Sequence, residues 1–138
     1  MATFDTRPPR RTPREKLAPT VLQEAADWYQ KACALHERGD LEQAVAAYSE
    51  ALRRIPDFHE ALDNRGLCLM RLGRFAEAIQ GLEQSAQVNP DSRLAFVALI
   101  KCYRASKQSV KAMHLAQHCV TKWPGQSPFD ETEAGPPG

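Results

Sequence analysis

Three prolines at a fixed interval constrain the fold of this chain more than any other feature of its sequence. Pro56, Pro90 and Pro124 lie 34 residues apart, and Gly39 and Gly73 share the same interval. A fixed period of this length is typical of repeat proteins, in which each repeat is one supersecondary unit. Aligned on the prolines, the repeats cover residues 25–58, 59–92 and 93–124.

Apolar and small residues predict two helices in each repeat. Both stripes follow spacings of four and three, which place their members on one face of a helix. The first stripe is Trp28, Ala32, Leu35; Leu62, Gly66, Leu69; and Phe96, Ile100, Tyr103. The second stripe is Ala44, Tyr48, Ala51; Ala78, Leu82, Ser85; and Ala112, Ala116, Cys119. Small side chains let two helix backbones approach closely, so each pair is predicted to pack antiparallel.

The ends of the helices follow from glycine and proline. Gly39 and Gly73 supply the left-handed conformation that ends a first helix, and each proline closes a second helix. Thr20 and Gln23 are expected to form a capping box at the start of the first helix. The helices are predicted at 21–38, 41–54, 58–72, 75–88, 93–106 and 109–122.

These stripes resemble the signature of the tetratricopeptide-repeat (TPR) family. The first repeat carries the signature at Trp28, Ala32, Leu35, Gly39, Ala44, Tyr48, Ala51 and Pro56, and the second at Leu62, Gly66, Leu69, Gly73, Phe75, Ala78, Leu82 and Pro90. The third departs from it at Ile100, Lys107 and Ser109. The resemblance covers about 100 residues, assigned to a domain at 20–124. It implies an all-α fold, a right-handed superhelical solenoid of three helix-turn-helix repeats and six helices.

Both ends of the chain are expected to be flexible, because they carry few side chains that could be buried. Residues 1–19 form a basic, proline-rich arm, and residues 125–138 form an acidic tail rich in proline and glycine. The sequence after Pro124 predicts no capping helix, so the face with Val110, Met113 and Val120 is expected to stay partly uncovered. A homodimer or a resident partner would cover this end; the alternative is that the tail with Phe129 folds back over it.

The resemblance also implies a binding groove. In this family the first helix of each repeat lines a concave surface, and the carried-over places predict a partner-binding groove at Tyr29, Cys33, Asn64, Leu67, Met70, Arg71, Val97, Lys101 and Arg104. Its apolar centre and cationic edge suit an extended acidic and apolar segment of a partner protein. The prediction is an adaptor or scaffold that binds a peptide or helix of its partner in this groove.

One known use of the family is not expected here. Clamping the acidic C-terminal tails of heat-shock chaperones requires lysine, asparagine, asparagine, lysine and arginine at five places. This chain has Tyr29, Cys33, Asn64, Leu94 and Ala98 at those places, so only Asn64 matches. A partner of this carboxylate-clamp type is therefore excluded from the prediction.

No motif for catalysis, a cofactor or a metal is evident, so an enzyme is not predicted. His114 and His118 lie four residues apart, but two ligands without a third more often belong to a helix surface than to a metal site. Cys33, Cys68, Cys102 and Cys119 lack a Cys-x-x-Cys pair and suit a reducing compartment. Cys33, on the groove side, is the thiol expected to be accessible.

Charge and hydropathy limit the remaining alternatives. The formal net charge is +1 and no apolar run is long enough to span a bilayer, so a cytoplasmic location is predicted. One alternative is a small secretion-type or assembly chaperone that holds a client protein. Another is binding of nucleic acid or an anionic surface through the basic N-terminal arm, although the arm lacks aromatic residues that would stack on bases.

Overall fold

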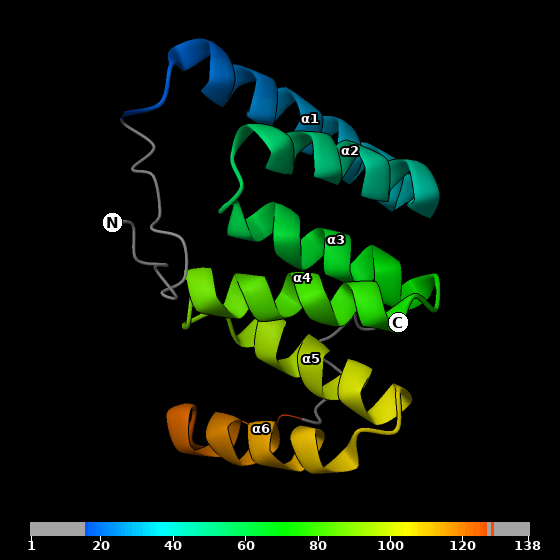
Figure 1. Cartoon of the computed structure of the whole chain (residues 1–138), viewed down its shortest axis with the longest axis vertical. Helices are drawn as coiled ribbons and strands as arrows, with labels where there is room; N and C mark the ends of the chain where they lie inside the picture. Colours follow the sequence, from blue (N-terminus) through cyan, green and yellow to red (C-terminus); the bar gives the residue numbers. More distant parts are fainter. Residues whose placement is uncertain (1–15, 127, 129–138) are drawn as a thin grey trace, which may run out of the picture.

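The computed structural model describes residues 16–126 and residue 128, and within this part of the chain all regular structure is helical. The helices are α1 (Pro19–Arg38), α2 (Leu41–Arg54), α3 (His59–Arg71), α4 (Phe75–Val88), α5 (Arg93–Ala105) and α6 (Ser109–Lys122). Each predicted helix is confirmed, with its ends within two residues of the expected positions. Figure 1 shows the helices stacked in sequence order, from α1 at the top to α6 at the bottom.

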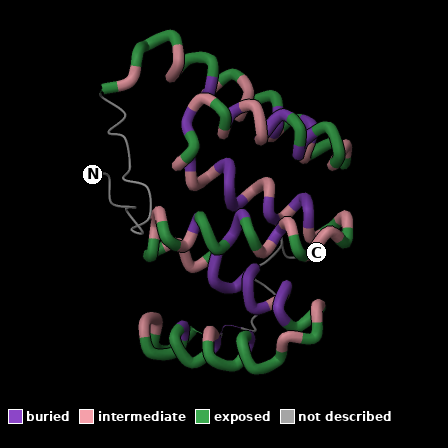
Figure 2. Tube along the Cα trace, in the orientation of Figure 1, coloured by how far each residue is buried: buried purple, intermediate pink, exposed green. Residues whose placement is uncertain are grey.

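Packing between consecutive helices makes the stack an all-α solenoid. Every helix contacts the next one, and the first helices α3 and α5 of successive repeats also contact each other. The buried residues follow the inner faces of the helices and leave the outer side of α6 exposed, as Figure 2 shows. Each repeat therefore contacts only its neighbours, and the core runs along the whole stack.

Side-chain sizes are complementary between the two helices of a repeat. In the second repeat, a Cβ added to Gly66 would lie 2.7 Å from Cγ of Leu82, so any larger residue would force Leu82 or the backbone to shift. In the third repeat the equivalent places hold Ile100 and Ala116, both buried. In the third repeat the large residue lies on the first helix and the small one on the second, which is the reverse of the second repeat. This exchange explains how the third repeat accommodates Ile100 where the family signature has a small residue.

The turns between the helices of each repeat share one backbone geometry. Gly39, Gly73 and Lys107 all have positive φ, of 86°, 77° and 63°. In each turn the following N–H donates to a carbonyl five residues earlier, as Asp40 does to Leu35 at 2.9 Å. This is the Schellman arrangement, which normally favours glycine. The third repeat forms the same turn with Lys107, although a side chain in this conformation is strained.

Helix α1 begins differently from the prediction. The N-cap residue is Ala18, Pro19 occupies the first turn, and no side chain caps the helix. The capping box predicted for Thr20 and Gln23 is therefore wrong. Proline explains the earlier start, because its fixed φ suits the first helical position and its missing N–H is one that a helix start leaves unbonded anyway.

The two terminal segments lie almost entirely outside the described residues. The basic arm predicted at 1–19 is described only from Lys16 onwards, and the tail predicted at 125–138 only at residues 125, 126 and 128. Phe129, which was considered as a cover for the last helix, is also outside them. Within the described residues, none of the helices has the length and apolar character needed to cross a membrane.

Candidate functional site

The nine predicted groove residues all lie on the first helices of the repeats. Helix α1 carries two of them, α3 carries four and α5 carries three. These helices are neighbours: Asn64 Nδ2 of α3 donates a hydrogen bond of 2.9 Å to Tyr29 Oη of α1, and α3 contacts α5. We call the surface formed by these nine residues the groove surface. They are Tyr29, Cys33, Asn64, Leu67, Met70, Arg71, Val97, Lys101 and Arg104.

Aromatic stacking orders the α1 side of the groove surface. The ring centroid of Tyr29 lies 4.9 Å from that of Phe58 and 5.8 Å from that of Tyr48. Burial, reinforced by the neighbouring Cys33, raises the pKa of Tyr29 to about 12, so its phenol is neutral at physiological pH. The stacked rings and the bond from Asn64 hold Tyr29 in place, which preorganises it for contact with a ligand.

Cys33 belongs to a polar chain that joins α1 to α2. The Tyr48 hydroxyl donates to Cys33 Sγ at 3.6 Å and lies 3.2 Å from Nδ1 of His36. Burial, and then the charge of Arg71, lowers the pKa of His36, so the imidazole stays neutral at physiological pH. The half-buried thiol of Cys33 is therefore held against the Tyr48 hydroxyl of α2.

The other three thiols are buried. Burial raises the pKa of Cys68 and of Cys102 to about 11, which disfavours the reactive thiolate. All four cysteines are free. Cys33 is thus the accessible thiol, as the sequence predicts, and the other three act as small packing residues.

The centre and the α5 side of the groove surface combine apolar and cationic side chains. Leu67 and Met70 are half-buried against the core, and Arg71 and Arg104 are exposed. Lys101 is half-buried. Val97 differs from the prediction, because it is only 6% exposed and offers little surface to a ligand. The apolar contacts available at the centre are therefore those of Leu67 and Met70 on α3.

The hydrogen-bonded cluster around Asp63, a buried carboxylate beside the groove surface, was not predicted from the sequence. Asp63 is 7% exposed and accepts hydrogen bonds from the hydroxyls of Ser85 and Ser92, the latter at 3.0 Å. Ser92 Oγ also accepts from the N–H of Ala95 and so caps α5. The cluster joins α3, α4 and the start of α5. The sequence indicates this cluster only through two serines: Ser85 and Ser92 occupy the places that Ala51 and Phe58 hold in the first repeat.

Comparison with known sequence families agrees with the repeat, the turns and the helix pairs. Residues 29–93 match the family model described as "Tetratricopeptide repeat". Over these residues the chain is a tetratricopeptide-repeat protein. The match includes α3 and most of α1, two of the three helices that carry the groove surface.

Curated relatives of this TPR chain are much longer proteins. The chain is 35% identical over 89 residues to "Phagocyte signaling-impaired protein" of Drosophila pseudoobscura pseudoobscura, which is 64% of this chain and 9% of the relative. It is 32% identical over 80 residues to "BBSome complex member BBS4 homolog" of Drosophila melanogaster, which is 58% of this chain and 16% of the relative. The chain thus spans less than a fifth of either relative.

Solved TPR structures have the same fold. The TPR domain of Arabidopsis OM64 superposes with a TM-score of 0.74 at 16% identity, covering 83% of this chain and 94% of that one. The first TPR of Spaghetti (RPAP3), bound to the HSP90 peptide SRMEEVD, gives 0.72 at 19% identity, covering 81% and 87%. The TPR2B domain of yeast Sti1, in complex with Hsp70, gives 0.69 at 22% identity, covering 80% and 82%.

The two histidines that the sequence offers as metal ligands lie on the surface of α6. No group of three histidine, cysteine, aspartate or glutamate side chains within them is placed to hold a metal ion. His114 and His118 are both exposed on α6, and the ring of His118 lies 5.3 Å from that of Phe96. This pair is accounted for as a helix surface.

Proposed function

We propose that this TPR protein is a binding module whose groove surface holds a peptide or short helix of a partner protein. The observation that carries the proposal is the ordered contact between α1 and α3, where Asn64 bonds to Tyr29 and the half-buried Leu67 and Met70 lie on the same helix as Asn64. An ordered aromatic and apolar surface suits the anchor residues of a partner. Solved TPR structures that contain bound peptides support this use of the fold.

The charges around this surface favour an acidic and apolar segment. Arg71 follows Met70 on α3, and Lys101 and Arg104 lie on α5, which contacts α3. A guanidinium pairs with a carboxylate through two parallel hydrogen bonds, which gives both affinity and orientation. The proposed ligand therefore places an apolar side chain against α3 and carboxylates toward α5.

The proposed partner is not a terminal carboxylate of the heat-shock type. Of the five places of that clamp, only Asn64 has the required residue, and here its amide donates to Tyr29. Ala98, at the place of the clamp arginine, is buried. The proposed function is thus an adaptor or scaffold in the cytoplasm, without catalysis, that recognises an internal segment of its partner.

A peptide selection with matched variants tests the groove surface. Internal segments would be selected from a displayed peptide library on the full-length chain, and their affinities measured for the Met70→Asp/Arg71→Glu variant. The control is Ala46→Asp/Arg53→Glu, which introduces the same two acidic residues at exposed places on α2. We expect at least about tenfold weaker binding for the first variant only, since an anchor and a cation are lost together. Equal peptide affinities of the two variants would show that the binding site is not the groove surface.

The alternatives from the sequence give different results in the same selection. A chaperone would bind a whole client protein tightly and short peptides weakly, whatever residue 70 is. Binding through the N-terminal arm would be lost on deleting residues 1–15 and would fall steeply with salt, because phosphate contacts release counterions. Either result would replace the peptide-binding proposal.

A further inference from the structure

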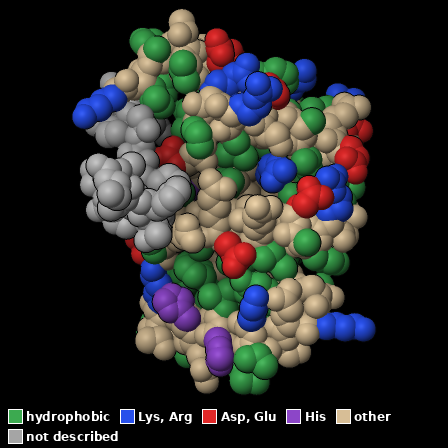
Figure 3. Space-filling view, viewed as in Figure 1, with side chains coloured by type: hydrophobic (Ala, Val, Ile, Leu, Met, Phe, Trp, Pro, Cys, Tyr) green, Lys and Arg blue, Asp and Glu red, His purple; other side chains and the backbone are tan. Residues whose placement is uncertain are grey.

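A small hollow opens between α2, α3 and α4 and shares no residue with the groove surface. Its volume is about 220 Å³, and it is lined by Leu52, Pro56, Leu62, Arg65, Gln80, Gly81 and Gln84. Figure 3 shows mostly hydrophobic and uncharged surface between α2 and α4 on the face in view. Pockets for small-molecule ligands are typically ~300–1,000 Å³, so this hollow suits a single side chain. We call the surface of these lining residues the α2–α4 pocket.

Gly81 leaves the floor of the pocket open. It lies in the interior of α4, where glycine destabilises a helix relative to alanine. Among the described residues, a Cβ added to Gly81 would meet only Nη1 of Arg65, at 3.8 Å, which is ordinary contact. Packing of these residues therefore does not require a glycine here, in contrast to Gly66. A helical glycine without a packing role is typical of a place where a ligand or another chain approaches closely.

The third repeat closes the same place with its own side chains. The counterparts of the pocket residues one period later are Ala86, Pro90, Phe96, Leu99, His114, Leu115 and His118. Leu115, in place of Gly81, packs against the core, and Leu99 is only 3% exposed. The ring of His118 lies 5.3 Å from that of Phe96. The α2–α4 pocket is thus a feature of the junction between the first two repeats and is not repeated along the stack.

Arg65 supplies a fixed cation to the pocket. Its Nε donates a hydrogen bond of 2.9 Å to Ser49 Oγ on α2, and its side chain is half-buried. The N–H groups of its two terminal nitrogens have no hydrogen-bond or ion-pair partner among the described residues. A guanidinium that is already held by one bond loses less freedom when it pairs with a carboxylate. Arg65 is therefore preorganised to bind an anion.

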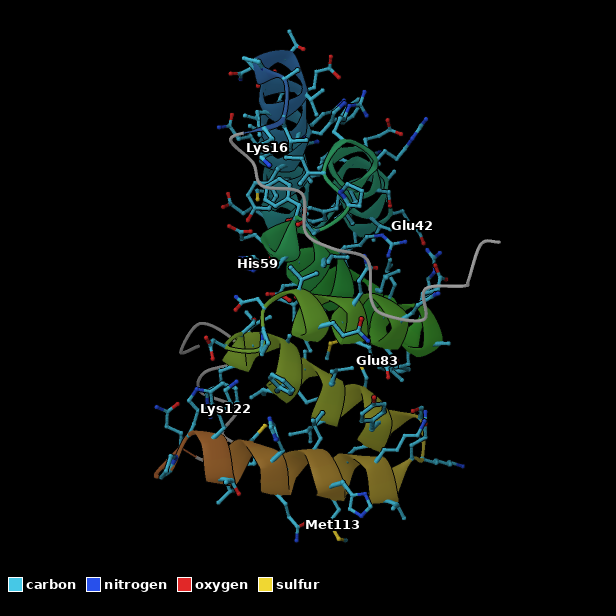
Figure 4. The ribbon with its side chains drawn as sticks, turned by 60° about the vertical axis from the view of Figure 1, so that its left-hand side comes forward. Lys16, Glu42, His59, Glu83, Met113 and Lys122 are labelled. Atoms are coloured by element: carbon cyan, nitrogen blue, oxygen red, sulfur yellow. The ribbon has the colours of Figure 1, made fainter. Side chains whose placement is uncertain are left out.

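The carboxylates near this part of α4 are engaged elsewhere. Glu77 accepts hydrogen bonds of 2.8 and 2.9 Å from Arg74. These bonds are the main reason that the pKa of Glu77 is lowered, and the charge of Arg65 is the last of its causes. Glu83 accepts a bond of 3.1 Å from Tyr103 and lies at the boundary between α4 and α5 (Figure 4). Neither carboxylate forms an ion pair with Arg65.

The rest of the lining determines the shape of a fitting ligand. Leu52 is half-buried at one wall, and Nε2 of Gln84 donates a hydrogen bond of 3.3 Å to the carbonyl of Pro56 at another. Apolar walls around a cation lower the local dielectric constant and so strengthen its attraction to an anion. The complementary ligand has a carboxylate on a short aliphatic stem, which describes the side chains of glutamate and aspartate.

We propose that the α2–α4 pocket binds the carboxylate side chain of a glutamate or aspartate from a partner protein. The carboxylate accepts hydrogen bonds from the terminal nitrogens of Arg65, and its aliphatic stem lies over Gly81 against Leu52. The small volume favours one side chain of a protein over a whole small-molecule ligand. This contact is additional to the peptide site proposed for the groove surface.

A pair of short peptides tests the pocket. The probe is a capped pentapeptide with glutamate at its centre between two leucines, and the control has glutamine in place of the glutamate. NMR of the ¹⁵N-labelled full-length chain would follow the backbone N–H of Gly81 and the side-chain Nε–H of Arg65. We expect saturable shifts of both signals with the glutamate peptide. The glutamine peptide should bind at least about tenfold more weakly, because hydrogen bonds to a charged group are the stronger ones.

Two variants place the probe on the molecule. Gly81→Leu fills the pocket with the residue that the third repeat has at this place, and it should abolish binding of the glutamate peptide. Arg65→Gln removes the cation and should weaken binding at least about tenfold. Met70→Asp/Arg71→Glu, in the groove surface, should leave the shifts of Gly81 unchanged. Circular dichroism checks folding, and Arg65→Gln decides the question if Gly81→Leu is unfolded.

Four results would overturn the proposal. The first is equal binding of the two peptides, and the second is binding that persists in both pocket variants. The third is binding of acetate as tight as that of the glutamate peptide, which would indicate a small carboxylate ligand. The fourth is peptide binding only after residues 129–138 are deleted, which would assign the pocket to the acidic tail of the chain itself. Because the pocket and the groove surface have separate variants, failure of either proposal leaves the other standing.

Discussion

At the scale of single residues, the contact between Gly66 and Leu82 sets how closely the helices of the second repeat approach. A methyl group at residue 66 would lie 2.7 Å from Cγ and 2.8 Å from Cδ2 of Leu82, which is fully buried. Atoms at this separation overlap, so either Leu82 or the backbone of α3 must shift. Overpacking of this kind in a core costs about 1–3 kcal/mol.

We therefore predict that Gly66→Ala lowers the free energy of unfolding by about 1–3 kcal/mol, measured by urea denaturation. Gly81→Ala is the matched control, because its added Cβ meets nothing closer than 3.8 Å, an atom of the Arg65 side chain. This change should raise the free energy of unfolding by up to about 1 kcal/mol, since alanine favours a helix over glycine. If both substitutions stabilise the protein, α3 and α4 do not approach each other as closely at Gly66 as described.

At the scale of elements, the cluster of Asp63, Ser85 and Ser92 joins three helices across the boundary between the second and third repeats. Burial raises the pKa of Asp63, although the bonds from the two hydroxyls and the nearby His59 act in the opposite direction. Glu60 adds to the rise. The folded chain therefore holds a proton on Asp63 at a pH where the unfolded chain has released it.

The pH dependence of stability follows from this difference. Stability linked to Asp63 is fully present below the pKa of an unfolded aspartate and is lost as pH rises through the raised folded pKa. Asp63→Asn removes this titration and keeps an acceptor for Ser85. We predict that the free energy of unfolding of the variant, relative to the parent, increases from pH 4 toward pH 7.

Urea denaturation of both proteins across that range measures this difference. His59 and Glu60 are present in both chains, so their own titration largely cancels in the comparison. A difference that stays constant with pH would mean that Asp63 titrates normally in the folded protein. A difference that falls with pH would mean that the hydroxyls of Ser85 and Ser92 hold the carboxylate charged.

The sequence predicts the helices well because their ends depend on local chemistry. Gly39 and Gly73 mark turns that need positive φ, and a proline two residues past each second helix limits its length. The 34-residue period then predicts the same turn at Lys107, and Lys107 adopts it although it is not a glycine. Six helices in three pairs follow from these few positions.

Contacts between helices were harder to predict than the helices themselves. The hydrogen bonds of Asp63 and the stacking of Tyr29 on Phe58 join residues from different helices, and the repeat period alone does not specify them. The start of α1 at Pro19 was missed because two capping signals competed, and proline prevailed over Thr20. The nine groove residues remain a prediction about ligand contact, with Val97 now the least accessible apolar member.

At the scale of the whole molecule, the stack has two unlike ends. Each second helix inside the stack is covered by the helix that follows it, whereas the equivalent face of α6 holds the exposed Met113 and Val120. In a solenoid the stability is approximately a sum over repeats and the interfaces between neighbours. The same substitution at equivalent places should therefore have different effects inside the stack and at its end.

Val45 and Met113 provide this comparison, because they occupy equivalent places on α2 and α6 and are 7% and 62% exposed. Val45→Glu would bury a carboxylate between α2 and α3 and should lower the free energy of unfolding by at least about 2 kcal/mol. Met113→Glu should change it by no more than about 0.5 kcal/mol in urea denaturation at low protein concentration. If Met113→Glu were as harmful as Val45→Glu, this face of α6 would already be covered within the chain. If it were harmful only at high protein concentration, a second copy would be the cover. A small effect at every concentration would mean that neither the rest of the chain nor a second copy covers Met113 on α6.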